Sequence, residues 1–88
     1  MTRYVLGVDL GTSGPKVALV TTTGEVVDHD TEKVGLTLLP KGGAEQDPNE
    51  WWAAIVASTR RLVERNPAAA EKVTAICMSS QWGGLVPV

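Results

Sequence analysis

The sequence predicts an α/β fold in which one helix crosses a mixed sheet, with the elements in the order β-β-β-α-β. Apolar runs near residues 3–9, 16–22 and 25–34 are separated by short turns rich in glycine and hydroxyl residues, a pattern typical of strands in hairpins. A helical apolar period follows the third run. Residues 73–78 then form a fourth apolar run, which a helical crossover would place parallel to the first strand.

The three N-terminal strands differ in their side-chain patterns. Residues 3–9 are apolar on both faces, which is typical of a strand covered on two sides. Pro15 has no N–H for a ladder and is expected at the start of the second strand. Charged residues interrupt the third strand, which suits a wet sheet edge. We expect His29 on this strand to be solvated, the alternative being a ligand or a base.

Helix signals follow a long connection at residues 35–46, which is rich in glycine and expected to be irregular. Asp47 is a good N-cap, Pro48 suits the first helical position, and Glu50 has the spacing of a capping box. Pro67 ends the helix. The expected apolar stripe consists of Trp51, Trp52, Ile55, Thr59, Leu62 and Val63. We expect its tryptophans in the core, the alternative being stacking on a sugar.

Composition excludes several classes of protein. The 88 residues are 43% hydrophobic with a net charge of −2, which allows one small domain and gives no basic surface for nucleic acid. No apolar segment approaches the ~18 residues of a membrane span, and the N-terminal run lacks the features of a signal peptide. Cys77, the single cysteine, is expected to be a small buried hydrophobe. We expect a cytoplasmic protein.

The strongest functional motif is the stretch at residues 7–14, which reads GVDLGTSG. A tight turn of this kind presents backbone N–H groups to an anion. Thr12 and Ser13 add hydroxyl donors and Lys16 adds a cation. Asp9 would repel phosphate directly, so its expected role is to hold Mg²⁺ through water. The alternative is an ordinary β-hairpin with a surface aspartate.

A second polar loop is predicted beside this motif. Asp9 ends the first strand, and the sequence Ser-Ser-Gln-Trp-Gly-Gly at residues 79–84 follows the fourth. Because the carboxyl ends of parallel strands meet at one rim of a sheet, we expect the two loops to form one site.

Three motifs, in order along the chain, resemble known proteins. The GVDLGTSG stretch resembles the first phosphate loop of the actin-like ATPase superfamily, whose ribonuclease H-like fold includes sugar kinases, actin and heat-shock chaperones. The stretch AEQDPNEWW at residues 44–52 is similar to the loop-to-helix junction of the FGGY carbohydrate kinases, xylulose kinases most closely. Residues 81–84, Gln-Trp-Gly-Gly, correspond to the Gln-Met-His-Gly sugar loop of that family.

This resemblance implies transfer of the γ-phosphate of ATP, with Mg²⁺, to a hydroxyl of a pentulose such as xylulose or of a related sugar or polyol. Asp9 would position the metal and phosphates. The resemblance places the terminal phosphates against Gly11, Thr12, Ser13 and Lys16. It places the acceptor sugar against Gln81, Trp82 and Gly83.

Two residues depart from the family pattern. Trp82 replaces methionine and Gly83 replaces histidine. A glycine offers only backbone hydrogen bonds, which leaves another pentulose or a polyol open as the acceptor. Trp82 either stacks on the sugar or fills a gap in the core.

The family's catalytic base lies well beyond this length of chain, so we expect residues 1–88 to be the N-terminal part of the first lobe of a kinase. The expected parts are a phosphate hairpin (3–34), a loop (35–46), a helix (47–66) and a strand with its sugar loop (72–84). Alone, the chain is expected to be inactive and to self-associate through the fourth strand or the helix stripe. The alternatives are a chaperone- or actin-like nucleotide-binding module and a stand-alone interaction domain.

Overall fold

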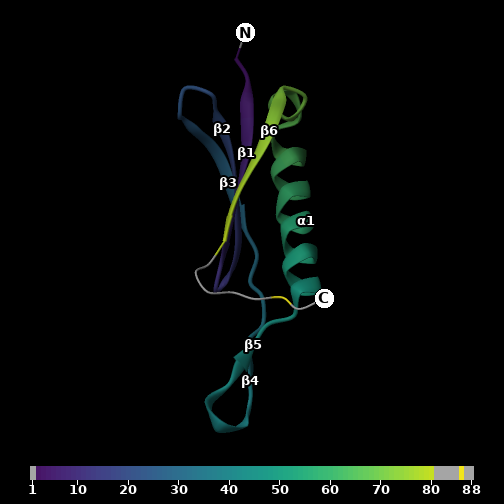
Figure 1. Cartoon of the computed structure of the whole chain (residues 1–88). Coiled ribbons are helices and arrows are strands. Elements are labelled where there is room, and N and C mark those ends of the chain that lie inside the picture. Colours follow the sequence, from purple (N-terminus) through teal and green to yellow (C-terminus); the bar gives the residue numbers. More distant parts are fainter. Residues whose placement is uncertain (1, 81–85, 87–88) are drawn as a thin grey trace.

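A computed structural model describes residues 2–80 and 86 of the chain. Its main sheet has four strands in the order β3-β2-β1-β6, and one long helix lies along one face (Figure 1). The strands are β1 (Tyr4–Gly11), β2 (Gly14–Thr21), β3 (Val26–Thr31) and β6 (Val73–Ser80). The helices are α1 (Pro48–Arg65) and the short α2 (Pro67–Ala70).

The sheet is mixed, as predicted. β1 pairs antiparallel with β2, and β2 pairs antiparallel with β3. β6 returns parallel to β1, in a register that sets Val5 opposite Ala75 and Asp9 opposite Ser79. The α/β class and the β-β-β-α-β order of the main elements are therefore confirmed. β1 and β6 both end at the same end of the molecule (Figure 1).

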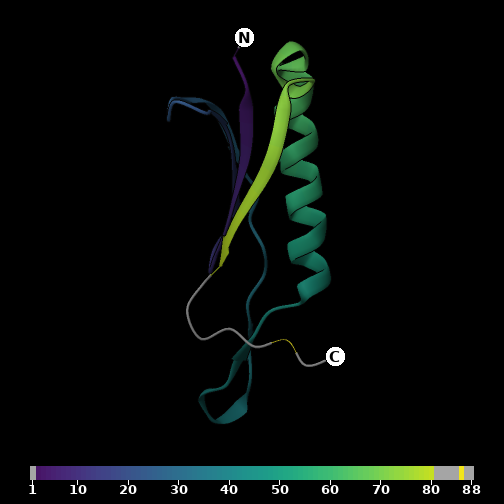
Figure 2. The same cartoon turned by 45° about the horizontal axis from the view of Figure 1, so that its top comes forward.

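The connection at 35–46 is more ordered than expected. It contains β4 (Thr37–Leu38), a 3-10 turn (Pro40–Gly42) and β5 (Ala44–Glu45), and the two short strands pair antiparallel. Lys41 takes a φ of 68° at the tip, and the Leu39 N–H donates to the Gly43 carbonyl over 2.7 Å. This hairpin projects beyond the main sheet and lengthens the molecule to 55 Å (Figure 2).

Helix α1 begins where its capping residues predict. Asp47 accepts the Asn49 N–H at 2.9 Å, and Pro48 opens the first turn. The Glu50 carboxylate accepts the N–H of Gly35 at 3.2 Å, so this side chain ties the connection to the helix. Among the residues described, no helix is long and apolar enough to cross a membrane.

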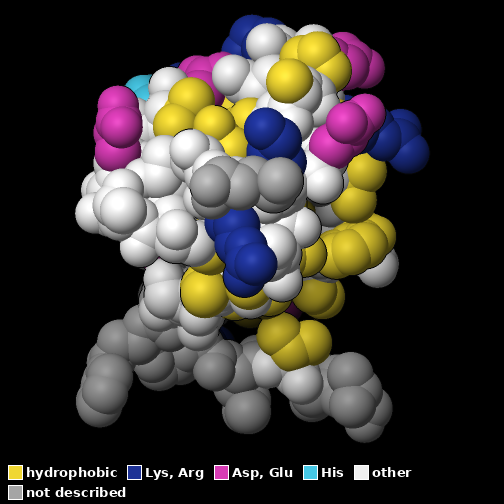
Figure 3. All heavy atoms as spheres, turned by 90° about the horizontal axis from the view of Figure 1, so that it is seen from above, with side chains coloured by type: hydrophobic (Ala, Val, Ile, Leu, Met, Phe, Trp, Pro, Cys, Tyr) yellow, Lys and Arg dark blue, Asp and Glu magenta, His cyan; other side chains and the backbone are white. Residues whose placement is uncertain are grey.

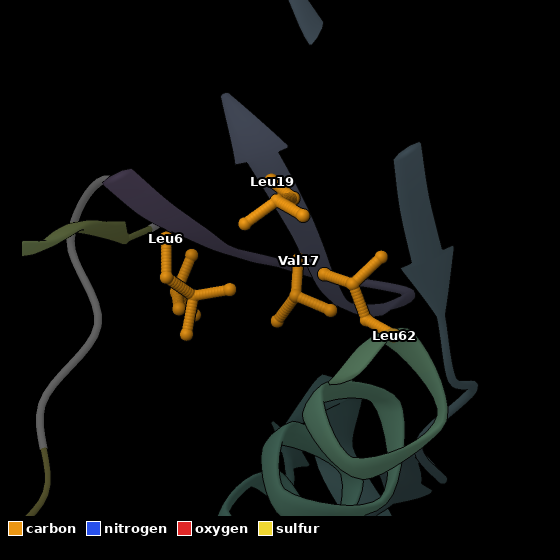
Figure 4. Packing of buried hydrophobic residues seen from close by; sticks show 5 residues of the cluster. Leu6, Val17, Leu19 and Leu62 are labelled. Atoms are coloured by element: carbon orange, nitrogen blue, oxygen red, sulfur yellow. The ribbon is translucent and has the colours of Figure 1, made fainter. Parts of the chain in front are cut away.

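The core lies between α1 and the inner face of the sheet. Leu62 of the helix packs against Val17 and Leu19 of β2 and Leu6 of β1 (Figure 4). Val17 and Leu62 are almost completely buried, at 0% and 1% exposed. Burial of such side chains stabilises the fold by roughly 1.5–3 kcal/mol each, so this cluster holds the helix on the sheet.

The helix buries only part of the face that its apolar pattern predicted, because Leu62 and Ile55 join the core but Trp52 and Val63 are exposed. Ala54, Ser58 and Leu62 are buried, whereas Trp52 is 67% exposed. The small side chains at 54 and 58 let the helix approach β2 closely, and the bulkier Trp52 turns away. The core prediction is therefore wrong for Trp52, while Trp51 is half-buried.

Strand β6 is exposed along nearly its whole length. Ile76 and Met78 are 63% and 64% exposed, and Cys77 is exposed as well, so its predicted burial is wrong. These residues are exposed because β6 lies at one edge of the sheet, whereas α1 lies against β2 and β3 toward the other edge. Hydrophobic side chains also reach the surface between charged groups in the view from above (Figure 3).

A cluster of ion pairs joins the edge strand β3 to α1. Arg61 contacts Asp30 and Glu32 at 2.8 and 2.9 Å, and Arg65 contacts Asp28 and Asp30 at 3.0 and 2.8 Å. Hydrogen bonds from Arg65 lower the pKa of Asp28 to about 2. Those from Arg61 hold the pKa of Asp30 well below its usual range. The strand order also confirms the predicted position of β3 at the edge of the sheet.

Candidate functional site

The β1–β2 turn (residues 11–14) forms the tip of the first hairpin. Gly11 and Gly14 face each other in the strand register, and the two residues between them, Thr12 and Ser13, are exposed. Gly14 has a φ of 140°, a conformation that L-residues rarely adopt. The turn is therefore tight, and its hydroxyl side chains lie at the surface.

A side chain at position 14 would meet the neighbouring backbone. A Cβ built on Gly14 would lie 1.9 Å from the carbonyl oxygen of Glu32. The segment after β3 thus passes directly against the turn, and its Val34 N–H donates to the Ser13 carbonyl at 3.1 Å. Only glycine allows this close approach.

Asp9 stands near the end of β1, between two polar neighbours. In the register it lies opposite Lys16 of β2 and Ser79 of β6. The Ser79 hydroxyl donates to Asp9 Oδ1 at 3.0 Å. Side chains alternate along a strand, and Val8 is buried beneath α1. Asp9 therefore lies on the opposite face, away from the helix.

A shallow groove of about 310 Å³ runs along this face. Its lining includes Gly7, Asp9, Lys16, Ala18, Cys77 and Ser79. The residues without long side chains leave the backbone of the middle of the sheet accessible, and one carboxylate and one ammonium group stand at the end near the turn. A ligand that carries negative charge together with a bound cation would complement this pair, its negative charge facing Lys16 and its cation facing Asp9.

The structure brings together most of the residues singled out in the sequence. Asp9, Lys16 and the β1–β2 turn with Gly11, Thr12 and Ser13 lie at one rim of the sheet. Gln81, Trp82 and Gly83 lie outside the described residues. β6, which leads to them, ends beside β1 as expected.

Asp9 fits the coordination habits of Mg²⁺. This ion commonly takes one or two carboxylates, keeps several waters and uses phosphate oxygens for the rest. Asp9 is exposed and lies on β1 just before the β1–β2 turn. This exposure suits a site in which the metal keeps several waters. Within residues 2–80 and 86, no three His, Cys, Asp or Glu side chains come close enough to form a metal cage.

Sequence reasoning missed two side chains of this rim. The sequence predicts Ser79 only as part of a loop, although its position two residues after Cys77 puts it on the same strand face as Asp9. Gln46 donates from Nε2 to the Thr12 carbonyl at 2.7 Å. No local pattern indicates that bond, because 34 residues separate the two positions.

Solved structures similar to this chain include sugar kinases, which have the actin-like ATPase fold. A Brucella ovis protein described as a "xyloylose kinase" superposes with a TM-score of 0.86 and 30% identity, covering 90% of this chain and 17% of that one. The ligand-bound xylulose kinase of Lactobacillus acidophilus gives a TM-score of 0.79 and 29% identity, covering 90% of this chain and 16% of that one. The fold predicted from the sequence is confirmed.

The model of the N-terminal domain of the FGGY family of carbohydrate kinases matches residues 4–88. A xylulose kinase of Staphylococcus epidermidis is 38% identical over 98% of this chain, and a gluconokinase of Bacillus subtilis is 30% identical over 100% of this chain. The chain belongs to the FGGY family. It spans about 17% of the length of these curated relatives.

Proposed function

We propose that this chain is the N-terminal part of the first lobe of a sugar kinase, which transfers the γ-phosphate of ATP to a sugar or polyol hydroxyl. The observation that carries the proposal is the placement of the Asp9 carboxylate and the β1–β2 turn on one rim of the sheet. Phosphoryl transfer depends on positioning and charge stabilisation, and this rim brings together a carboxylate oxygen, a cation and the donors of the turn.

In the proposed mechanism, the rim residues of this chain act on the phosphates of ATP. Asp9 would hold Mg²⁺ through water, and the bound ion would supply positive charge to neutralise the phosphoryl group being transferred. The N–H groups and hydroxyls of the β1–β2 turn donate to terminal phosphate oxygens, and Lys16 adds positive charge. The base that accepts the proton of the sugar hydroxyl comes from outside these 88 residues.

The acceptor is proposed to be a pentulose such as xylulose, a related sugar acid or a polyol. Relatives named xylulose kinase and gluconokinase support this range. Gln81, Trp82 and Gly83 are proposed to contact the acceptor. Gly83 carries no side chain, so any selectivity at that position comes from its backbone and from the shape of the pocket.

The direct test uses the complete polypeptide that carries this domain. ADP formation is measured with Mg·ATP and a panel of xylulose, other pentuloses, gluconate and polyols. We expect ADP release that depends on one acceptor class, together with a phosphorylated product seen by mass spectrometry. ATP turnover that no acceptor changes would contradict the kinase proposal and favour a chaperone- or actin-like module.

We also propose that the 88 residues alone are inactive and self-associate. β6 is an edge strand, and an open edge favours pairing with another chain. Beside it, Trp52, Ile55, Ile76 and Met78 line an apolar groove of about 260 Å³ between the strand and α1. A second copy that pairs along β6 would cover this surface.

Sedimentation velocity at micromolar concentration tests the self-association. The wild-type chain is expected to sediment as a dimer or larger species. Met78→Lys, which places charge in the groove, should shift it toward the monomer, whereas Lys41→Met at the tip of the β4–β5 hairpin should not. A strictly monomeric wild-type chain would refute this part of the proposal.

A further inference from the structure

Two segments hold the β1–β2 turn through its carbonyl groups. The Gln46 side chain donates from Nε2 to the Thr12 carbonyl at 2.7 Å. The Val34 N–H donates to the Ser13 carbonyl at 3.1 Å. Gln46 lies between β5 and Asp47, the N-cap of α1. A side chain at the start of the helix therefore contacts the β1–β2 turn.

The bond from Gln46 fixes the direction of a neighbouring donor. No cis peptide bond occurs among the described residues, and in a planar trans peptide the C=O and N–H point in opposite directions. The Thr12–Ser13 peptide directs its carbonyl oxygen at Gln46. Its N–H, which belongs to Ser13, therefore points away from Gln46.

This central peptide is the part of a four-residue turn that can reverse. Type I and type II turns differ mainly by rotation of the central peptide through about half a turn. A reversed Thr12–Ser13 peptide would present a carbonyl oxygen where the Ser13 N–H stood. An oxygen there would repel phosphate, so binding of an anion at this turn depends on which way the peptide is held.

We propose that Gln46 is a positioning residue for phosphate binding: its amide anchors the Thr12 carbonyl and so keeps the Ser13 N–H directed at the phosphate. The inference rests on the proposed role of the turn in phosphate binding. Gln46 itself does not touch the phosphate in this account. It acts only through the orientation of the peptide.

The test follows backbone amides of the ¹⁵N-labelled 88-residue chain by NMR, with Mg²⁺ and inorganic tripolyphosphate as the probe. NMR detects the weak, millimolar binding expected of a turn that acts without the rest of a kinase. The variant Gln46→Met keeps the length of the side chain, adds no charge and removes the donor. Glu45→Gln, at the exposed neighbouring position, is the matched control.

In the wild-type chain, tripolyphosphate should shift the Ser13 amide resonance. Gln46→Met should move that resonance before any probe is added and weaken tripolyphosphate binding by a factor of roughly 2–10, the range for one neutral hydrogen bond. Glu45→Gln should do neither. Unchanged amide positions of Val17 and Leu19, in the core, would show that the variant keeps the fold.

The two possible failures are distinct. Equal tripolyphosphate binding in wild type and Gln46→Met, with the Ser13 resonance unmoved between them, would overturn the role of Gln46 and leave phosphate binding at the turn intact. A wild-type chain in which tripolyphosphate shifts no amide of the β1–β2 turn would overturn the phosphate role itself, and the inference with it.

Discussion

Replacing Gly14 with alanine should destabilise the fold through the contact between the β1–β2 turn and the segment after β3. The new Cβ would lie 1.9 Å from the Glu32 carbonyl oxygen, a distance that real Cβ atoms do not show. The segment must therefore move outward. That movement would weaken the bonds from the Val34 N–H to Ser13 and from the Glu32 N–H to Pro15.

The expected magnitude follows from these contacts. Each backbone hydrogen bond contributes about 0.5–1.5 kcal/mol, and alanine at a φ of 140° adds about 1–3 kcal/mol of backbone strain. Gly14→Ala should thus lower the free energy of unfolding by about 2–6 kcal/mol. Gly24→Ala is the control, because Gly24 also has a positive φ, of 97°, but nothing lies within 4 Å of its added Cβ.

Urea denaturation followed by far-ultraviolet circular dichroism measures both variants, and hydrogen exchange reports on the Val34 amide. Gly14→Ala should cost more than Gly24→Ala by at least about 1 kcal/mol, the value of one to two hydrogen bonds. It should also speed exchange at Val34. Equal losses of unfolding free energy in the two variants, with the Val34 amide still protected, would refute the contact between the β1–β2 turn and the segment after β3 as the cause.

Further expectations concern α1 and its contacts. Ser58 is fully buried and its hydroxyl has no hydrogen-bond partner in the described part of the chain, so Ser58→Ala should raise the free energy of unfolding by about 1 kcal/mol in a urea titration; a loss would mean that the hydroxyl is satisfied. Leu62→Ala should cost about 2–5 kcal/mol, whereas Trp52→Ala should change stability by less than about 1 kcal/mol; comparable melting-temperature losses would contradict the helix orientation. The lowered pKa values of Asp28 and Asp30 mean that their contribution to stability is complete above their ordinary value of 3.8 and falls as the pH drops below it, toward about 2 for Asp28 and lower still for Asp30. Stability should therefore decline over that interval, less steeply in Asp30→Asn and in high salt, and an identical slope in the variant would exclude the ion pairs as its cause.

Much of the fold could be predicted from the sequence because its signals are local. Alternating apolar residues and a two-residue turn between Gly11 and Gly14 define the first hairpin. Asp47 and Pro48 mark the start of α1 within one residue, because capping depends on the first turn of the helix alone. The parallel return of β6 follows from the handedness of a helical crossover.

Predictions failed where the outcome depends on packing between distant segments. The exposure of Trp52 follows from how closely Ala54 and Ser58 let α1 approach β2, which hydrophobic periodicity does not encode. Cys77 is exposed because its strand lies at the sheet edge. In an isolated apolar run, an edge strand and a central strand look alike.

The sequence predicts only the part of the candidate site whose residues are close together along the chain. Asp9 and the glycines of the β1–β2 turn form a contiguous motif, so the sequence predicts them directly. Ser79 and Gln46 lie far along the chain and reach Asp9 and Thr12 only after the sheet and the connection have formed. The strand register and long-range side-chain contacts determine that these two residues reach the site.

The central claim, that Asp9 serves phosphate transfer through a metal, is tested most directly by Asp9→Asn in the complete polypeptide. The substitution keeps the shape and removes the negative charge. Turnover with Mg·ATP at saturating sugar is measured beside the Kd of the sugar, with Glu25→Gln, an exposed carboxylate in the β2–β3 turn, as the control. We predict that Asp9→Asn lowers kcat by roughly two orders of magnitude and leaves the sugar Kd nearly unchanged. A variant with wild-type kcat at ordinary Mg²⁺ concentration would contradict the account.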